Sequence, residues 1–508
     1  MPGPETPRIY TWDDLAAALA DNYSPIAVRQ IEAAWRYAEA AHQGQHRLTG
    51  EPYISHPLAI AVEVAKLKLD RASVIAALLH DVVEDTPISL NEIKRRFGGK
   101  VAELIDGLTK LNRLPSRGGL FVQGERRLDR YERQMETYRK LFLATSKDLR
   151  VIILKLLDRL HNMRTLGALP PEKQQITASE TMAIFAPIAY RLGIGSIKGE
   201  LEDLSFSYLE PQAYAEIKSL LKREGPTRTK IIDRCTKVLA RELKEAGIEA
   251  QISGRAKHYY SLFRKLPRYQ HDISQIYDLV ACRVVVKDIE SCYRVLGAIH
   301  QRWHPIAGRV KDYIAQPKPN GYRSLHTTVK ATDNRAIEIQ IRTERMHQEA
   351  EYGVAAHWFY HEQKGAASYL ARQVEAISRS YRWVNELAKK QRQVKSLDEF
   401  EELMKIDFFG DRIFVYTPKG EVIDLPAGAT PIDFAYAIHT DIGNQLTAAK
   451  VNGRLIRLSD PLASSDTVEL IINRKSRPKA DWLRQCQTGL ARAAIRQALK
   501  KEPARPTS

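Results

Sequence analysis

Four residues in the first third of the chain are of the types that bind a divalent metal ion. They are His56, the adjacent pair His80-Asp81, and Asp158, and they lie in or beside three apolar segments with helical spacing. A carboxylate inside such a segment is costly to bury unless it meets a cation or a metal. Imidazole and carboxylate ligands together suit Mn²⁺ best, with Zn²⁺ or Fe²⁺ as alternatives. We expect the bound ion to activate a water molecule and to polarise a phosphoryl oxygen.

The ordered set carries this prediction, because each member alone has an ordinary explanation. A single histidine on a helix is more often a structural residue, and a His-Asp dipeptide by itself is weak evidence. Glu84 and Asp85 are candidates for an acid, a base or a group that orients water; alternatively they are helix-terminal charges. Further candidates to contact a phosphorylated substrate, unless they are plain surface residues, are Arg47, Lys155, Asn162 and Thr165.

A basic segment begins a second group of candidate residues. The segment 254–261 reads GRAKHYYS and is followed by Arg264-Lys265. Several cations close to a serine hydroxyl form a suitable cradle for a polyphosphate. The side chains concerned are Arg255, Lys257, Ser261 and Lys265. Arg283 lies further on, inside the apolar run VACRVVV, where we expect it to meet an anion or a carboxylate.

One carboxylate precedes this apolar run, and another lies within a later alternating strand. Asp278 comes just before the run, and Glu338 and Gln340 lie on one face of the strand AIEIQIR, because residues two apart point the same way. Asp278 and Glu338 are candidates to share a Mg²⁺ ion beside bound phosphates. In a nucleotidyl- or pyrophosphoryl-transfer site such carboxylates hold the metal and deprotonate an attacking hydroxyl. The alternative is that both form ordinary salt bridges.

A third feature is the segment 308–326, GRVKDYIAQPKPNGYRSLH, which we predict to be a long loop. Its cations suit phosphates and its tyrosine rings suit a base, worth ~1–3 kcal/mol per stacked base. The sequence contains no GxxxxGK[ST] motif, so ordinary P-loop kinase chemistry is not supported. The side chains concerned are Arg309, Lys311, Lys318, Arg323 and His326, with Tyr313 and Tyr322 between them.

The elements that must position these groups belong to several domains. The chain has 508 residues, which at roughly 100–200 per domain indicates three or four domains. The first region, from about 24 to 190, has apolar helical periodicity over 58–69, 72–83 and 151–163, with a mobile loop over 115–124. Helices over 211–224, 227–246 and 289–303 then alternate with strands over 248–252, 280–286 and 336–342.

The remaining third of the chain reads as a connector and a small module. Residues 360–402 are polar and helix-prone, and 408–472 combine short strands with one helix, as in a grasp-like module. The expected strands are 412–416, 421–425, 447–451 and 467–471, and the expected helix is 431–439. The basic tail after 473 is predicted to be a solvated helix with a frayed end.

Composition bounds the class of protein. Hydrophobic residues make up 44% and charged residues 27% of the chain, which argues against wholesale disorder. Lys and Arg number 78 and Asp and Glu 61, and the net charge of +17 favours polyanionic partners. Four cysteines without a CxxC pair argue against a disulfide framework or a cysteine zinc site. Neither a signal pattern nor an apolar run of the ~18–20 residues that span a bilayer is present, so we expect a cytoplasmic protein without membrane contact.

Long stretches of the sequence resemble the long RelA/SpoT homologues, the Rel-type (p)ppGpp synthetase/hydrolases. The resemblance runs from about residue 24 to 499. It is carried, in order, by EPYISHP, ALLHDVVEDT, DRLHNMRTL, RLGIGSIKGELEDLSF, GRAKHYYS, GRVKDYIAQPKPNGYRSLHTTV, EIQIRT and AEYGVAAHW. The later segment that begins DRIFVYTPKGEVIDLPAGATPIDFAYAIHTD resembles the TGS domain of the same proteins.

This resemblance implies a multidomain protein of α and α+β class. The expected domains are an all-helical HD hydrolase domain over 24–190, an α/β nucleotidyltransferase-like synthetase domain with a helical lead-in over 191–355, a helical connector over 356–405, a small β-grasp TGS domain over 406–472, and a basic helical tail over 473–508. The longer members of the family continue through further helical, zinc-finger or related, and ACT domains, whereas this sequence ends shortly after the TGS-like region. We therefore leave ribosome coupling and C-terminal regulation open.

For the first domain, the resemblance implies hydrolysis of the 3′-pyrophosphate of (p)ppGpp with Mn²⁺. Glu84 and Asp85 match the catalytic pair, and Arg47, Asn162 and Thr165 match positions that contact guanosine or phosphate. Since the whole set is present, we expect a competent hydrolase. Leu157 stands where the family usually has a small alanine, which is a packing difference. The positions that match metal ligands are His56, His80, Asp81 and Asp158.

For the second domain, the resemblance implies transfer of the β,γ-pyrophosphate of ATP to the 3′-hydroxyl of GTP or GDP with Mg²⁺. Asp278 matches the Mg²⁺ ligand, Glu338 the base on the 3′-hydroxyl, and Tyr322 the ring that stacks on guanine. Neither Ala256 nor Cys282, which replace the family's usual Pro and Ile, removes a catalytic group. Arg255, Lys257, Ser261 and Lys265 match ATP-phosphate positions, and the other nucleotide-binding candidates are Arg283, Lys311, Lys318, Asn320, His326 and Gln340.

For the third domain, the resemblance implies contact with uncharged tRNA on the ribosome, with His439 at the matching position. We expect a bifunctional stringent-response enzyme whose halves adopt opposed conformational states, with 191–203 as part of the coupling element. One alternative is a tRNA- or ribosome-binding regulator with degenerate catalytic halves, and another is a hydrolase-dominant enzyme with weak synthesis. An oligomer is compatible with the sequence, which does not set the preference for GTP or GDP.

Overall fold

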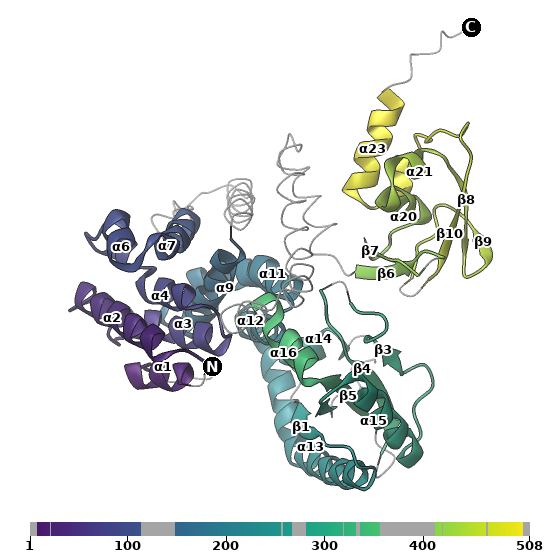
Figure 1. Cartoon of the computed structure of the whole chain (residues 1–508). Helices are drawn as coiled ribbons and strands as arrows, with labels where there is room; N and C mark the ends of the chain where they lie inside the picture. Colours follow the sequence, from purple (N-terminus) through teal and green to yellow (C-terminus); the bar gives the residue numbers. More distant parts are fainter. Residues whose placement is uncertain are drawn as a thin grey trace. The chain divides into compact units, whose positions relative to one another are not determined.

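The computed structural model describes residues 8–20, 22–112, 148–255, 258–266, 281–318, 320–331, 336–355, 412–418, 420–463 and 466–500. The chain divides into two compact units, 1–388 and 389–508, and each is described by itself. Their contents confirm the predicted class, because an all-helical part, a mixed α/β part and a small strand-rich module follow one another along the chain (Figure 1). The loop predicted over 115–124 and the connector predicted over 360–402 lie outside the described residues.

The first part of the first unit consists of helices around an apolar core. Helices α3, α4 and α9 pack side by side at its centre (Figure 1). Helix α1 buries Leu15 and Leu19 against α3, although it precedes the predicted start of the domain at residue 24. The helices are α1 (Trp12–Leu19), α2 (Pro25–Ala41), α3 (Ser55–Lys66), α4 (Arg71–Leu79), α5 (Val82–Asp85), α6 (Leu90–Phe97), α7 (Gly99–Asn112), α9 (Leu149–Arg164), α10 (Pro171–Glu180) and α11 (Ala186–Arg191).

The prediction of a single helix over 72–83 is wrong, because α4 ends at Leu79 and α5 begins at Val82. The backbone carbonyl of Asp81 accepts hydrogen bonds from the amides of Glu84 and Asp85 at 3.0 and 2.8 Å, which starts a new turn. His80 and Asp81 therefore lie at the junction of two helices. Glu84 therefore does not lie one turn after His80 on a continuous helix.

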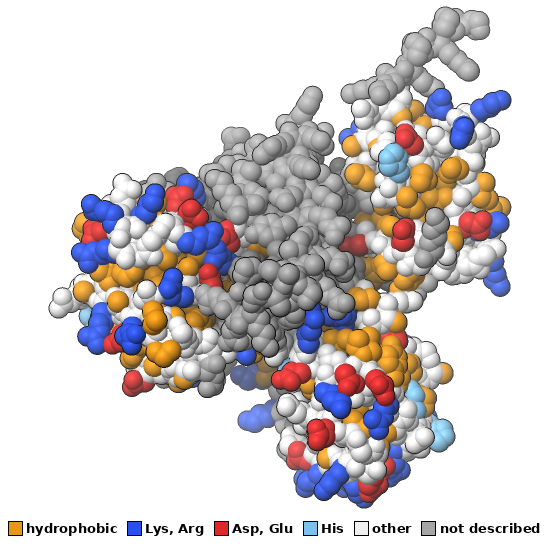
Figure 2. Space-filling model, in the orientation of Figure 1, with side chains coloured by type: hydrophobic (Ala, Val, Ile, Leu, Met, Phe, Trp, Pro, Cys, Tyr) orange, Lys and Arg blue, Asp and Glu red, His pale blue; other side chains and the backbone are white. Residues whose placement is uncertain are grey.

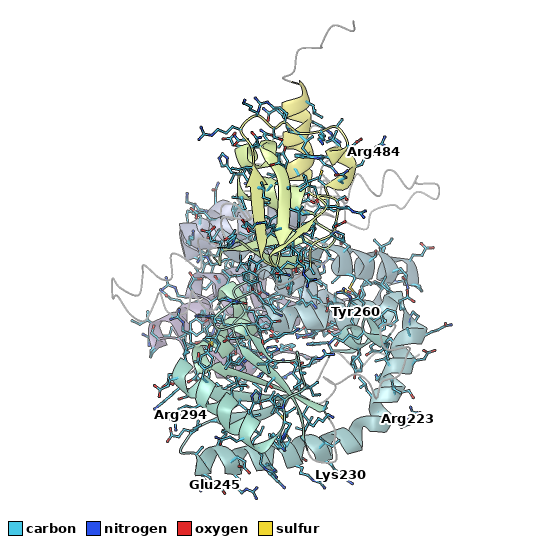
Figure 3. All side chains as sticks on the ribbon, turned by 90° about the vertical axis from the view of Figure 1, so that its right-hand side faces the viewer. Arg223, Lys230, Glu245, Tyr260, Arg294 and Arg484 are labelled. Carbon is cyan, nitrogen blue, oxygen red and sulfur yellow. The ribbon has the colours of Figure 1, made fainter. Side chains whose placement is uncertain are left out.

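Helix α12 (Gly195–Leu209) leads into α13 (Pro211–Glu245), which replaces the two helices expected over 211–224 and 227–246. The helix continues through Gly225-Pro226 but changes direction between Arg223 and Lys230 (Figure 3). Both halves are anchored: Ile217 packs with Phe206 and Leu262, and Leu239 belongs to the core below the sheet. Tertiary packing thus overrides a local break signal.

The sheet of the first unit has the strand order β1-β2-β5-β4-β3, in which β2 and β5 are parallel and all other pairs are antiparallel. The strand expected over 248–252 starts later, because the turn after α13 includes Gly247 at a φ of +66°. A short strand, β3, lies inside the loop expected over 308–326. The elements are β1 (Gln251–Arg255), α14 (Tyr259–Phe263), β2 (Ala281–Val286), α15 (Ile289–Arg302), β3 (Lys311–Asp312), β4 (Leu325–Lys330), β5 (Ala336–Thr343) and α16 (Glu344–Tyr352).

The two faces of this sheet differ in chemistry. One face packs on α13 and α15 through alternate strand residues such as Cys282, Val284 and Ile339, which form one apolar core. Alternation places the intervening residues, among them Arg283 and Glu338, on the opposite face. Arg283, Glu338 and Gln340, three of the polar candidates of the second domain, therefore lie on the same side of the sheet.

The second unit combines a three-stranded sheet, β10-β8-β9, and a two-stranded sheet, β6-β7. Strand β9 and helix α21 were not expected, whereas β6, β7, β8, β10 and α20 lie within one residue of their predicted bounds. The elements are β6 (Arg412–Tyr416), β7 (Val422–Pro426), α20 (Pro431–Ile438), α21 (Thr440–Asn444), β8 (Leu446–Val451), β9 (Arg454–Ile456), β10 (Val468–Ile472), α22 (Trp482–Gln485) and α23 (Gly489–Lys500).

The tail expected to be a solvated helix is instead packed against α20. Trp482 and Ile495 are buried with Tyr436 in one apolar cluster. The fully buried carboxylate of Asp433 in α20 accepts hydrogen bonds from the backbone amide of Thr488 and from its hydroxyl, at 2.7 and 2.8 Å. It also accepts one from the amide of Gln487 at 2.9 Å. The tail as far as α23 is therefore part of the folded unit.

Two surface properties bear on partners. On the face shown in Figure 2, the Lys and Arg side chains of the described residues are interspersed with acidic ones, so this face carries no single continuous basic patch among them. Among the described residues, none of the helices combines the length and apolarity that crossing a bilayer requires.

Candidate functional site

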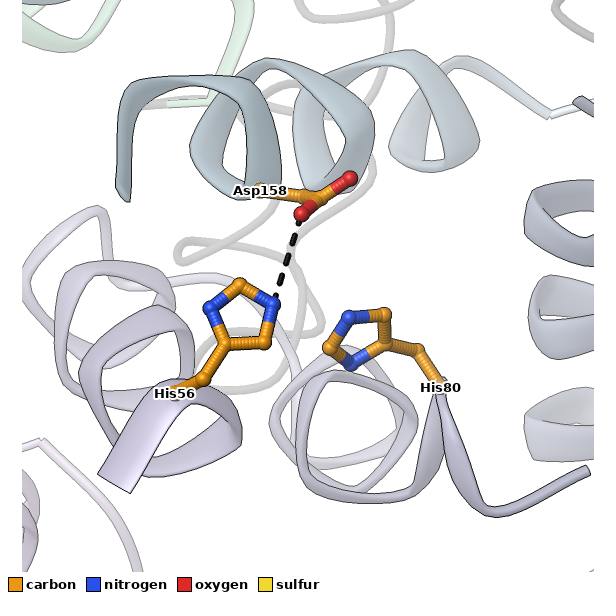
Figure 4. A group of neighbouring side chains, drawn as sticks. All are labelled: His56, His80 and Asp158. Carbon is orange, nitrogen blue, oxygen red and sulfur yellow. Dashed lines mark ion pairs between the residues drawn. The ribbon is translucent and has the colours of Figure 1, made fainter. Parts of the chain in front are cut away.

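Three elements bring the first set of predicted ligands together. His56 is the second residue of α3, His80 directly follows α4, and Asp158 lies in the middle of α9. One ligand atom from each lies within 4.8 Å of the others, and all three residues are buried (Figure 4). Asp81 joins them, with its Oδ1 3.2 Å from Nε2 of His80 and its Oδ2 3.6 Å from Nε2 of His56.

The hydrogen bonding of His80 leaves a lone pair directed at this cluster. Its Nδ1 lies 2.8 Å from the carbonyl oxygen of Ala77, so Nδ1 donates its hydrogen there. Nε2 is then unprotonated, and this buried atom has no hydrogen-bond partner among the described residues. A lone pair facing carboxylate oxygens is unfavourable by itself, and a cation between them removes the conflict. The donor set of imidazole nitrogen and carboxylate oxygen fits a divalent transition metal.

The charges around Asp158 keep its carboxylate ionised. Burial alone raises the pKa of Asp158, but the Lys155 ammonium, 2.7 Å from Oδ2, outweighs it and holds the pKa well below its usual value. Asn162 donates to Oδ1 of Asp158 at 2.7 Å. Burial lowers the pKa of His56, which favours the neutral imidazole that binds metals.

Tyr53 connects the metal cluster to the predicted acid–base pair. Its hydroxyl lies 2.8 Å from Oδ2 of Asp81 and 2.9 Å from Oδ2 of Asp85. Burial and the two nearby carboxylates raise the pKa of Tyr53, so it stays a hydrogen-bond donor. Asp85 is exposed and Glu84 half-buried at the edge of the cluster. Tyr53 was not predicted from the sequence, although it lies three residues before His56 in EPYISHP.

Arg47 gathers the predicted nucleotide contacts of the first domain. Its Nη2 lies 3.3 Å from Oδ1 of Asn162 and 3.1 Å from Oγ1 of Thr165, and its Nη1 lies 3.0 Å from Nδ1 of His161. Burial, together with neighbouring His56 and the charge of Arg47, lowers the pKa of His161 to about 2, so this ring is neutral. His161 was also missed, although it follows Asp158 by one helical turn.

On the polar face of the sheet, Glu338 is held by two neighbours. Gln340 donates from Nε2 to Oε1 of Glu338 at 2.7 Å, and Nδ1 of His326 lies 3.5 Å from the same oxygen. The hydroxyl of Tyr322 lies 2.8 Å from the other ring nitrogen of His326. Glu338, Gln340, His326 and Tyr322 thus form one row of polar contacts from β5 across β4 to the preceding loop.

Two tyrosines and a lysine lie beside this row. The Lys318 ammonium lies 4.6 Å from the ring centre of Tyr313 and 5.1 Å from that of Tyr322. The backbone amide of Tyr322 donates to Oδ1 of Asn320 at 3.2 Å. Lys311 is exposed in β3, where it pairs with His326 across the sheet. This loop therefore offers aromatic rings on which a planar base can stack and cations that can bind phosphates.

The predicted ATP-phosphate positions are only partly described. Ser261 lies in α14 and Lys265 just after it, both half-buried. Lys257, Asp278 and the side chain of Arg255 lie outside the described residues. The start of α14 is tied to α12, because Asp203 accepts from Nδ1 of His258 at 2.8 Å and from the amide of Tyr260 at 2.9 Å.

Arg283 meets a carboxylate at the end of the polar face. Its Nη2 lies 3.0 Å from Oε1 of Glu351, which also lies 3.3 Å from Nη2 of the deeply buried Arg342. His347 lies beside them, and burial with the two guanidinium charges lowers its pKa to about 4. One carboxylate therefore contacts both guanidinium groups. In the second unit, His439 is exposed and caps α21 by accepting from the amide of Asp441.

Comparison with known proteins adds three family matches and close relatives. The chain matches the HD domain over 34–195, the region found in RelA / SpoT proteins over 254–365, and the TGS domain over 413–472. It is 44% identical over 492 residues to the bifunctional (p)ppGpp synthase/hydrolase SpoT of Escherichia coli K12, covering 97% of this chain and 68% of that protein.

Two further matches are a second curated relative and a solved structure that covers part of this chain. The GTP pyrophosphokinase of Myxococcus xanthus is 43% identical over 472 residues, covering 93% of this chain and 60% of that protein. Among solved structures, small alarmone synthetase 2 from Bacillus subtilis is 25% identical, with a TM-score of 0.24, over 34% of this chain and 98% of that one.

Proposed function

Because this chain belongs to the RelA/SpoT family, we propose that it is a bifunctional enzyme of (p)ppGpp metabolism. It transfers pyrophosphate from ATP to the 3′-hydroxyl of GTP or GDP, and it hydrolyses (p)ppGpp to GTP or GDP and pyrophosphate. Relatives named as a (p)ppGpp synthase/hydrolase and as a GTP pyrophosphokinase support both activities. The observation that carries the proposal is the convergence of His56, His80 and Asp158 in a chain that also has the RelA/SpoT region.

In the hydrolase half, His56, His80, Asp81 and Asp158 would hold a divalent cation, which we propose is Mn²⁺. Such an ion supplies an activated water and a polarised phosphoryl oxygen when bound. The protein groups do the rest: Tyr53 orients Asp81 and Asp85, and Glu84 and Asp85 at the rim accept or return protons. Arg47, Asn162 and Thr165 are the proposed contacts of the guanosine nucleotide, and they already lie in one hydrogen-bonded group.

In the synthetase half, Glu338 would accept the proton of the attacking 3′-hydroxyl, since Gln340 and His326 fix its carboxylate in place. Tyr322, and Lys318 lying over its ring, would bind the guanine and phosphates of the acceptor nucleotide. The ATP phosphates are assigned to Arg255, Lys257, Ser261 and Lys265. Mg²⁺ is assigned to Asp278, with Glu338 as the second carboxylate.

We place the coupling of the two activities in α12 and the segment before it. Glu200 forms a bidentate ion pair with Arg164, at 2.6 and 2.8 Å, next to the proposed nucleotide contact Thr165. On the same helix Asp203 holds His258 and Tyr260. Simultaneous synthesis and hydrolysis would only cycle nucleotides, so we expect opposed states. Rates measured at each site with the other site saturated test this; if neither depends on the other's occupancy, the coupling is absent.

Several expectations about context stay predictions. Contact of the second unit with uncharged tRNA and the ribosome through His439, and a cytoplasmic location, follow from resemblance and composition alone. Oligomeric state is likewise open. The alternative of a regulator with degenerate catalytic halves finds no support, because the relatives are named as enzymes that make or hydrolyse these nucleotides.

One pair of assays tests the proposed function. The protein is incubated with ATP, GDP and Mg²⁺, and separately with ppGpp and Mn²⁺, and the nucleotide products are resolved. His80→Ala is expected to abolish only the second reaction and Glu338→Ala only the first. Since each variant serves as the folded control of the other, loss of both reactions in either variant contradicts two separate sites. Absence of both reactions in the parent protein contradicts the proposed function.

A further inference from the structure

The buried side chain of His161 lies between the metal cluster and Arg47. Its Nδ1 is 2.9 Å from Nδ1 of His56 and 3.0 Å from Nη1 of Arg47. These contacts join residues 105 and 114 positions apart in the sequence. The ring is only 6% exposed, so water does not compete for these bonds.

Arg47 determines which ring nitrogens carry hydrogen. A guanidinium group only donates hydrogen bonds, so Nδ1 of His161 must accept and cannot be protonated. The 2.9 Å contact between the two Nδ1 atoms then requires that the hydrogen belongs to His56. His56 is thereby fixed with its hydrogen on Nδ1 and its lone pair on Nε2, the atom that lies 3.4 Å from Asp158 and 3.6 Å from Asp81.

The geometry points to His161 as a positioning residue of the metal centre, which sets the tautomer and ring orientation of His56 and at the same time holds Arg47. This inference rests on the proposed metal role of His56. The outer hydrogen bond of a metal-binding imidazole fixes its tautomer and raises its basicity, and its loss typically costs about 10–100-fold in metal affinity. The tautomer of His80 is fixed by a hydrogen bond to the backbone carbonyl of Ala77, whereas that of His56 depends on the side chain of His161.

The arrangement also links substrate contact to metal binding. Arg47 and His56 share one acceptor atom, so displacement of Arg47 releases the constraint that orients the His161–His56 hydrogen bond. With Arg47 gone, His161 can donate to His56 instead, which would leave a hydrogen on Nε2 of His56 facing the metal position. Arg47 thus stabilises the metal-competent form of His56 without touching the metal.

The test is direct Mn²⁺ binding to the full chain, followed by the electron paramagnetic resonance signal of free Mn²⁺. His161→Leu keeps the bulk but removes the acceptor, and we expect its Mn²⁺ affinity to fall about 10–100-fold. His161→Asn places an amide oxygen at the same branch of the side chain and is expected to restore most of the affinity. His304→Leu, which removes an exposed imidazole, is the matched control and should bind as the parent does.

The outcomes separate this inference from the proposed function. If the parent binds no Mn²⁺ at the site, the proposed metal centre fails; if the parent binds and His161→Leu binds equally well, only the positioning role fails. Equal losses in the Leu and Asn variants would also overturn it, because the acceptor would then be irrelevant. If His161→Leu does not fold, as judged by loss of its synthetase activity, Arg47→Met is the deciding variant. Removal of the Arg47 positive charge would by itself tighten Mn²⁺ binding, whereas loss of its hydrogen bond to Nδ1 of His161 should weaken it. Tighter binding would therefore overturn the inference.

Discussion

Asp203→Ala should weaken ATP use in synthesis more than any other step. The carboxylate of Asp203 accepts two hydrogen bonds from the start of α14, one from His258 and one from the amide of Tyr260, at 2.8 and 2.9 Å. These bonds fix the end of the basic segment 254–261, to which we assign the ATP phosphates. Its side chain is 17% exposed, so water replaces the lost bonds poorly.

The magnitude follows from the type of bond. Hydrogen bonds to charged groups contribute about 1.5–3 kcal/mol each, and two at the lower end give about 3 kcal/mol. If the segment must be re-ordered each time ATP binds, that free energy appears in the KM for ATP, as a rise of about 10²-fold. Asp203→Asn keeps an acceptor for Tyr260 and should lie between the parent and Asp203→Ala.

Initial rates of synthesis at varied ATP and fixed GDP, and then the reverse, measure the effect. Ser207→Ala is the control, because Ser207 lies on the same helix and its hydroxyl donates to the carbonyl of Leu204 in its own turn. Hydrolysis of ppGpp by the same preparation verifies that the protein is folded. An ATP KM within twofold of the parent would refute the reasoning, and an equal rise in the KM for GDP would point to a general distortion of the sheet.

Three further predictions concern metal and stability. Chelation of divalent ions should abolish hydrolysis and lower the thermal stability of the first unit, because the lone pair of His80 then faces Asp81 without a cation; calorimetry with Mn²⁺ added back checks the reversal. Glu351→Gln leaves two adjacent guanidinium groups without their carboxylate and should cost about 3 kcal/mol, measured as a lower urea midpoint, with Arg345→Gln as an exposed control. His347 has a pKa of about 4 in the folded protein against an ordinary 6.5, so the unfolded chain binds its proton first and stability should fall as the pH drops from 6.5 toward 4; His347→Gln should flatten that part of the pH–stability curve.

Periodicity predicted most of the elements, because they bury regular faces. The strand AIEIQIR alternates strictly and forms β5 across its whole length, and the apolar run in 151–163 forms the centre of α9. The break between α4 and α5 could not be predicted, because the apolar pattern continues through His80-Asp81 although the helix itself is interrupted there. At Gly225-Pro226 a break was predicted that does not occur, because α13 is packed into an apolar core on each side of this dipeptide.

The site was predicted where the residue types themselves carry the chemistry, and missed where a residue acts through another. His56, His80 and Asp158 differ enough from their apolar surroundings to be recognised in the sequence. His161 and Asp203 are identified only by contacts with residues more than fifty positions away, and such pairings leave no periodic signal. A single sequence therefore predicts the reacting groups better than the groups that orient them.

The hydrogen bonds of Asp433 decide where the C-terminal unit can be cut for separate study. The family match ends at Ile472, but a fragment truncated there would lack the amides of Gln487 and Thr488 and would expose the apolar side of α20. A buried carboxylate deprived of donors would then favour unfolding or aggregation. An expression boundary for tRNA-binding measurements belongs after α23.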